Sequence, residues 1–178
     1  GATLISKLID GKFPDYKAVM SQVLSTDREN DPDIIAAVAS FAALAISSIP
    51  HGKTLGMCRI GLVNDELVVN PLWSVLQSEE NKLSLTVAGH DEAVVMVEGG
   101  AEEVGEETML EALELAHETD KQIAELIDEL REKVGKEEQS FTPPPAGDSL
   151  SKAIDKQFGD SLRAAPITDG SKHVRAAA

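Results

Sequence analysis

The only long apolar helical pattern in the chain lies between Asp31 and Ile49, and it constrains the fold more than any other stretch. Asp31 can cap a helix, and Pro32 suits the first helical position because its missing N–H has no partner to lose there. Residues 34–49 are apolar almost all round, which predicts a helix buried on most sides. We therefore expect a helix over 32–48 at the centre of a layered fold.

Alternating apolar residues predict strands on both sides of this helix. The predicted strands cover 17–26, 55–63, 66–70, 83–89 and 93–98. Two short turns, Asn64–Asp65 and residues 90–92, join neighbouring strands into hairpins. A buried helix followed by hairpins predicts an α/β fold of the α+β layered kind, in which a mixed sheet is packed with helices.

The period changes to that of a helix over 105–134. One apolar stripe runs along this segment opposite a charged face, and it consists of Met109, Leu113, Ala116, Ile123, Ile127, Leu130 and Val134. We expect this amphipathic helix to cover one face of the sheet and to end at Gly135.

Two shorter helical patterns complete the predicted elements. Residues 72–77 form a helical turn in which Trp73 and Leu76 lie three apart and pack against the core. A later apolar repeat consists of Leu150, Ile154, Phe158 and Leu162.

A proline-rich linker divides the chain into parts. They are a divergent N-terminal segment, a partial core, the linker, and a helical start with an irregular tail, at 1–16, 17–135, 136–147 and 148–178.

Composition limits the partners of the chain. A formal net charge of −15 opposes attraction to phosphates, and 3% aromatic residues leave few rings for base stacking. We therefore expect no DNA binding and weak RNA binding at most. No apolar run reaches the roughly 18 residues of a membrane span, and the N-terminus has no signal-peptide layout, so we expect a cytoplasmic protein without membrane contact.

One polar motif resembles the end of a phosphate-binding loop. It is His51-Gly52-Lys53-Thr54, and the first glycine of such a loop would stand at Ser47. Because Thr54 also leads into a strand rather than a helix, a turn is the expected structure.

Three other features have a structural and a functional interpretation. The acidic run 27–33 can hold a cation, but acids beside a helix start also favour capping, which we expect here. His90 lies in a turn without an assignable partner, which favours an exposed residue over a catalytic base. Cys58 lies in the apolar alternation of a strand, which favours a core residue over a reactive thiol.

Five separated segments resemble one known family in order and spacing. They are ENDPDI (29–34), FAALAISSIP (41–50), CRIGLVNDELVVNP (58–71), LTVAGHDEAVVMVE (85–98) and EETMLEALELAHE (106–118). These segments are similar to polynucleotide phosphorylase (polyribonucleotide nucleotidyltransferase), in the C-terminal half of its first RNase PH-like core. The resemblance covers Val23 to Leu162, where the last helical repeat is similar to the start of the all-helical domain of that family.

The resemblance implies 3′-to-5′ phosphorolytic degradation of RNA in mRNA turnover, carried out by the whole enzyme as a homotrimer with phosphate and Mg²⁺. In that family the phosphate-binding loop and the catalytic aspartates belong to the second core, which this chain does not resemble. At the corresponding hairpin, Ser84 and Leu85 stand where the active core has an acidic residue. We therefore expect no catalytic residue and no cofactor in this chain, with Glu98 a weak candidate metal ligand.

The N-terminal residues depart from the family. Residues 5–10 are similar to its TSRLID-like stretch and Phe13-Pro14 to an LFP-like element, but the arginine-rich segment between them is missing. Residues 6–16, SKLIDGKFPDY, also resemble a segment of bacterial DNA sliding clamps.

Two function classes remain open from the sequence. The chain is either part of a polynucleotide phosphorylase that works only in a longer chain or assembly, or a non-catalytic domain, natural or engineered, that binds a protein partner. If three copies of the turn near Lys53 faced a central opening, they would offer a weak positive ring for RNA. Lys53 and Arg59 are therefore the weak candidates for RNA contact.

Overall fold

The computed structural model describes residues 19–140 and 148–164 and separates into two compact units, Gly1–Phe141 and Thr142–Ala178. The described part of the larger unit contains, in chain order, α2 (Pro32–Ala45), β1 (Gly56–Val63), β2 (Glu66–Val69), α3 (Trp73–Leu76), β3 (Asn81–Gly89), β4 (Val94–Ala101) and α4 (Glu106–Val134). The predicted N-terminal segment 1–16 and part of the predicted linker, 141–147, lie outside the described residues.

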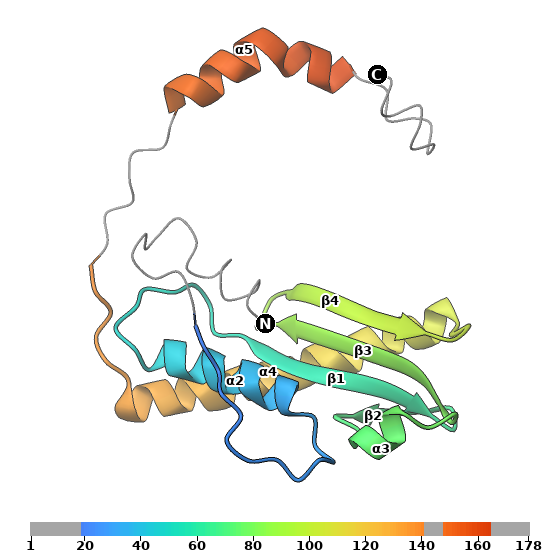
Figure 1. The fold of residues 1–178 in the computed structure, drawn as a ribbon. Helices are drawn as coiled ribbons and strands as arrows, with labels where there is room; N and C mark the ends of the chain where they lie inside the picture. Colours follow the sequence, from blue (N-terminus) through green and yellow to red (C-terminus); the bar gives the residue numbers. More distant parts are fainter. Residues whose placement is uncertain (1–18, 141–147, 165–178) are drawn as a thin grey trace. The chain divides into compact units, whose positions relative to one another are not determined.

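Four strands form one sheet in the order β2-β1-β3-β4 (Figure 1). All three pairings in this sheet are antiparallel, so the expected mixed sheet was wrong in strand direction for the part of the chain that is described. Short turns account for two of these pairings, because the β1–β2 and β3–β4 hairpins reverse the chain. The pairing of β1 with β3 is also antiparallel, although β2 and α3 lie between these strands in the chain. Helices pack on this sheet as expected for a layered α/β fold.

The predicted turn Asn64–Asp65 joins β1 and β2. Both residues have positive φ, 50° and 64°, and Val63 pairs with Glu66 beside them. Left-handed values at both central residues belong to a type I′ turn, whose twist matches that of antiparallel strands. Asn and Asp tolerate this conformation better than most residues, so the pair Asn64–Asp65 was enough to predict the hairpin.

The predicted strand over 17–26 is wrong where the structure describes it. Val19 to Thr26 has no regular secondary structure and pairs with no described strand, and residues 17 and 18 lie outside the described part. Ser21 instead attaches the segment to α2 through a hydroxyl contact of 2.6 Å with Ser40. Alternation alone does not make a strand, because its backbone groups need a neighbouring strand to bond with.

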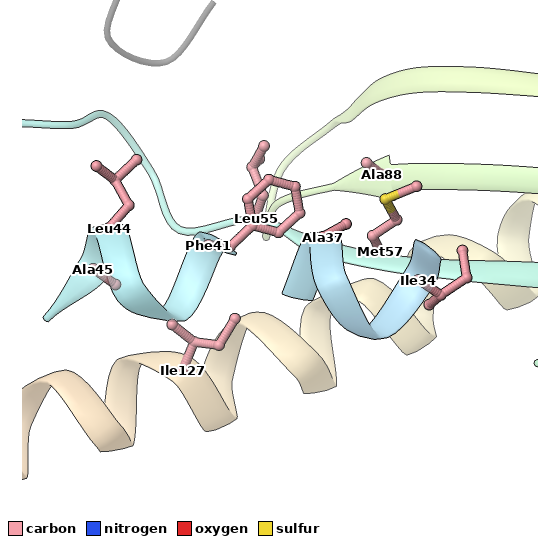
Figure 2. Close-up of a cluster of buried hydrophobic side chains, with 9 residues drawn as sticks. All are labelled: Ile34, Ala37, Phe41, Leu44, Ala45, Leu55, Met57, Ala88 and Ile127. Carbon is pink, nitrogen blue, oxygen red and sulfur yellow. The ribbon is translucent and has the colours of Figure 1, made fainter. Parts of the chain in front are cut away.

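Helix α2 begins as predicted. The Asp31 side chain accepts a hydrogen bond from the Asp33 N–H, and Pro32 occupies the first turn. The helix ends at Ala45, three residues before the predicted end at 48. Just after this end, the hydroxyl of Ser47 donates to the Leu44 carbonyl oxygen at 2.7 Å. Its buried face joins a cluster, shown in Figure 2, of Ile34, Ala37, Phe41, Leu44, Ala45, Leu55, Met57, Ala88 and Ile127.

Strand β1 is buried on both sides because different helices cover its two faces. One face belongs to a second cluster, formed by Cys58, Ile60, Leu62, Leu83, Leu85, Val87, Ala112 and Ala116. Met57, which points to the opposite face, packs instead with α2. The sheet at this strand therefore lies between α2 and α4.

Helix α4 packs on the sheet through small residues. Ala112, Ala116 and Ala124 are buried along it. Where α4 meets β1, a Cβ atom on Gly56 would lie 2.0 Å from the carbonyl oxygen of Asp120. Only glycine permits this approach, so helix and strand are in direct backbone contact at this point.

The predicted apolar stripe of α4 is correct only in part. Ile127 is buried, but Leu130 is 39% and Val134 59% exposed, because the last turns of α4 extend past the ends of the strands (Figure 1). A buried charged residue, Asp120, was missed, since a carboxyl group carries no apolar signal.

The expected packing of Trp73 against the core is also wrong. Trp73 in α3 is 48% exposed. Polar contacts hold this turn, since the Trp73 N–H donates to the Glu29 carbonyl oxygen at 2.6 Å and the Ser74 hydroxyl to the Glu29 carboxylate at 2.8 Å. The short helix is therefore attached to the loop before α2 through one backbone and one side-chain hydrogen bond to Glu29.

After α4 ends, with Gly135 as its cap, the chain lies along the loop that follows α2. The Lys136 N–H donates to the Ile46 carbonyl oxygen at 3.1 Å, and the Gln139 N–H to the Ser48 carbonyl oxygen at 2.9 Å. These bonds hold the start of the predicted linker on the larger unit.

The smaller unit contains α5 (Asp148–Ala164), which confirms the later helical repeat. Leu150, Ile154 and Phe158 are 67%, 47% and 49% exposed and lie four residues apart, so they line one side of the helix. Across the described ranges of the chain, no helix is both long and apolar enough to span a bilayer.

Candidate functional site

A row of polar side chains crosses the sheet on the face that carries α2. Arg59 of β1 pairs with Thr86 of β3, which pairs with Glu98 of β4. The Arg59 Nε donates to the Thr86 hydroxyl at 3.2 Å. Together with Ser84 and Asp33 these residues line a cleft of about 610 Å³. Two of the predicted site residues, Arg59 and Glu98, therefore lie in one cleft.

Two carboxylates hold the guanidinium group of Arg59. It forms ion pairs with Asp31 and with Asp33, the latter at 2.7 Å. Burial disfavours the charge on Asp31, but hydrogen bonds from Arg59 and from the Asp33 N–H outweigh this effect and lower the pKa of Asp31. Asp31 thus caps α2 and anchors β1 at once, and Arg59 is neutralised by acids from its own chain.

Lys53, the other predicted RNA contact, is neutralised in the same way. Its ammonium group lies 2.8 Å from the Asp91 carboxylate and 2.9 Å from that of Glu92. Hydrogen bonds to these two acids raise the pKa of Lys53. Because two negative charges surround one positive charge, this turn presents no net positive potential to a phosphate.

His90 helps to close the β3–β4 hairpin. Its Nδ1 accepts the Glu92 N–H at 3.1 Å and lies 3.1 Å from the Asp91 carboxylate. The Nε2 of His117 on α4 donates to the His90 carbonyl oxygen at 2.9 Å. These contacts tie the hairpin turn to α4 and give His90 a structural position.

Glu98 lacks the neighbours that a magnesium ion needs. Mg²⁺ is bound by oxygen ligands in octahedral geometry. Within 19–140 and 148–164, no group of three or more His, Cys, Asp or Glu side chains is placed to hold a metal ion. The other carboxylate of the cleft, Asp33, is paired with Arg59. The described residues therefore do not fit the Mg²⁺ that the family resemblance implies.

The remaining motifs have their structural roles. Thr54 leads into β1, as expected of a turn rather than a phosphate loop, and its hydroxyl donates to the Asp128 carboxylate at 2.5 Å. In the acidic run, Asp27 accepts the backbone N–H groups of Glu29 and Asn30 at 2.9 and 2.8 Å. Backbone hydrogen bonds from Asn30 and Glu29 lower the pKa of Asp27.

The sole cysteine in the described chain, Cys58, is fully buried, which confirms its predicted place in the core. Burial and the neighbouring carboxyl group of Asp120 raise the pKa of the Cys58 thiol well above its usual range. Because thiolate is the reactive form, this thiol is inert in the folded protein.

Comparisons with known proteins agree with this geometry. Residues 54–119 match the family described as "3' exoribonuclease family, domain 2", which covers the four strands and the first half of α4. The chain is 40% identical to the polyribonucleotide nucleotidyltransferase of Chloroflexus aggregans over 92% of its own length and 22% of the relative. It is 39% identical to the polyribonucleotide nucleotidyltransferase of Halothermothrix orenii over 91% of its own length and 24% of the relative. It is 41% identical to that of Xanthobacter autotrophicus over 92% of its own length and 23% of the relative.

An antiparallel sheet covered by α4, together with the family match over the same residues, gives the class of protein that this region is similar to: the 3′ exoribonuclease family, domain 2. The longer similarity is more specific. The chain is homologous to part of polyribonucleotide nucleotidyltransferase, as the five quoted segments predicted, and spans about a quarter of the length of these relatives.

Sequence reasoning did not foresee the partners of the two candidate cations. Arg59 and Asp31 are far apart along the chain, and no spacing rule connects a strand residue to a helix cap. Asp91 and Glu92 were visible beside His90, but their proximity to Lys53 depends on how two separate turns meet.

Proposed function

We propose that this chain is a non-catalytic core region of a polyribonucleotide nucleotidyltransferase. In this proposal the longer protein or assembly degrades RNA from its 3′ end by phosphorolysis in the cytoplasm, with phosphate as co-substrate and Mg²⁺ as cofactor. The described region serves as a scaffold within a homotrimer. Similarity to three such proteins over at least 91% of this chain supports the proposal.

One observation carries the non-catalytic part of the proposal: both candidate cations are paired with two acids each. Phosphoryl transfer needs unpaired donors aimed at the reacting phosphate. The charged groups of Arg59 and Lys53 already donate hydrogen bonds to carboxylates. Glu98 is unsuited to hold a metal ion, because it belongs to no group of three or more potential ligands among the described residues.

A phosphorolysis assay tests this part directly. The chain is incubated with single-stranded RNA, phosphate and Mg²⁺, and released nucleoside diphosphates are measured. We expect no release above the buffer level. Phosphate-dependent release that disappears in Glu98→Gln but persists in Glu80→Gln, a loop carboxylate outside the cleft, would show that the cleft is catalytic.

A transplant tests the scaffold role. Residues 19–140 replace the matching region of the Chloroflexus aggregans relative, and the chimera is assayed for phosphorolysis. We expect an active enzyme, because a scaffold needs only its fold and its contacts with the rest of the protein. A chimera that folds and assembles like the relative but is inactive would contradict the proposal.

A second function, binding of a protein partner, has an observation of its own in its favour. Leu126, Leu130 and Val134 on α4 are 66%, 39% and 59% exposed and lie four residues apart, so they line one side of the helix. Exposed apolar residues of this size mark contact surfaces when they adjoin. An inactive chimera whose isolated chain forms a stable complex with another protein would favour this alternative.

A further inference from the structure

Asp120 is a buried carboxyl group in the middle of α4, where the helix touches the sheet. Its side chain is 0% exposed, and neither carboxyl oxygen has a hydrogen-bond partner within the described residues. Asp120 is not part of the cleft or of either cation cluster. Nothing in the proposed function uses it.

The surroundings of Asp120 leave little space for a compensating group. A Cβ atom on Gly89 of β3 would lie 3.5 Å from the Asp120 carboxylate, and one on Gly56 of β1 would overlap the helix backbone. The helix therefore lies directly on two glycines.

Few titratable groups lie near Asp120, and those that do contact backbone carbonyl oxygens. From β1 comes Cys58, whose thiol is directed at the Ala116 carbonyl oxygen at 3.5 Å. From α4 comes His117, whose Nε2 donates to the His90 carbonyl oxygen. From β3 comes Gly89, which has no side chain to offer. Within the described residues, no lysine or arginine side chain forms an ion pair with Asp120.

Physical chemistry gives the preferred protonation state. Burial raises the pKa of Asp120 from 3.8 to about 7, and the thiol of Cys58 offsets part of this rise. An ionised carboxylate whose one neighbouring donor is a weakly donating thiol is expensive in an apolar site, whereas the neutral acid is tolerated. The closed arrangement of α4 on the sheet therefore favours the protonated acid.

We propose that Asp120 makes the packing of α4 on β1 and β3 dependent on protonation, so that the helix is held closed by the neutral acid and loosens when the acid ionises. The sign follows from linkage. Between the ordinary carboxyl pKa of 3.8 and about 7, opening of the helix releases one proton, so the opening equilibrium rises with pH. Above about 7 both states are ionised and the dependence ends.

Hydrogen exchange measured by mass spectrometry tests this proposal on the full chain. Exchange of the α4 peptides around residue 120 is followed from pH 5 to pH 8 and corrected for the intrinsic rate. The opening equilibrium should rise by up to about tenfold per pH unit below the midpoint and then level off. Asp120→Asn, which keeps the shape but cannot ionise, should remove this dependence. Glu118→Gln, which changes an exposed acid two residues away in the same helix, should keep it.

A second measurement does not depend on any variant. Carbon NMR of the Asp120 carboxyl group in the unmodified chain reports its titration directly, and a midpoint near neutral pH is expected. A midpoint near 4, or protection of α4 that has the same pH dependence in Asp120→Asn as in the unmodified chain, would overturn the proposal.

Discussion

Replacing Ile34 by alanine should destabilise the larger unit strongly. Ile34 is 6% exposed and packs in the cluster that joins α2 to the sheet and α4 (Figure 2). The substitution removes three carbon atoms from this cluster, worth about 0.8 kcal/mol each, or about 2.4 kcal/mol in transfer energy. The cavity left behind adds to this loss, so the free energy of unfolding should fall by about 2–5 kcal/mol.

The adjacent residue provides a matched control. Ile35 is the same residue type in the same helical turn but is 62% exposed. Ile35→Ala removes the same atoms from a mostly hydrated position, and alanine is the better helix former. The free energy of unfolding should therefore change by no more than about 0.5 kcal/mol. The difference between the two variants isolates burial from helix propensity.

Urea unfolding followed by far-UV circular dichroism measures both values. Ile34→Ala should lower the midpoint while leaving the slope with denaturant unchanged, because the surface exposed on unfolding stays the same. Equal losses in the two variants would refute the reasoning, since they would show that α2 does not bury the Ile34 side in preference to the Ile35 side. A loss below about 0.5 kcal/mol in Ile34→Ala would do the same.

The remaining predictions concern the polar sites. Arg59→Gln should lower the free energy of unfolding by about 1–3 kcal/mol at neutral pH in urea titrations, because charged hydrogen-bond partners are left behind. Since the pKa of Asp31 is lowered, the contribution of this pair is present above pH 3.8 and is lost as the pH falls below it, so the two proteins should converge in stability in acid; a constant difference would count against the pair. The Cys58 thiol should react with a chromogenic disulfide reagent only in denaturant, and rapid labelling of the native chain would show that α4 does not cover it. In fluorescence anisotropy, the chain should bind single-stranded RNA no more tightly than about 10⁻⁴ M at physiological salt. Asp91→Asn should strengthen this binding at low salt by partly freeing Lys53, while sub-micromolar binding of the unmodified chain that is lost in Lys53→Ala would mean that its acid pairs do not suppress phosphate contact.

Much of the local structure was predictable because the determining interactions are close in sequence. Asp31 and Pro32 set the start of α2 through groups one or two residues away. Asn64 and Asp65 set the β1–β2 turn through their own backbone conformation. The change of period at α4 required only the sequence of the helix itself. The family resemblance likewise needed only the order of short segments.

Tertiary structure decided whatever depends on a partner distant in sequence. The stretch from Val19 to Thr26 has the alternation of a strand, yet no described strand lies beside it to accept its hydrogen bonds. Trp73 has a large apolar side chain, which is typical of a core residue. It is nevertheless half exposed, because its turn is attached through a backbone hydrogen bond to Glu29.

The charged groups show the same division most clearly. The sequence alone determined that Arg59 and Lys53 carry positive charge, but only the packing of α2 and of the hairpin turn brought acids against them. In the sequence, Asp120 is one of many acids on a charged helix. Its burial follows from the close packing of α4 against Gly56 and Gly89. Charge is a property of a residue, whereas the energy of that charge depends on the atoms and the solvent around it, and these are set when the whole chain packs.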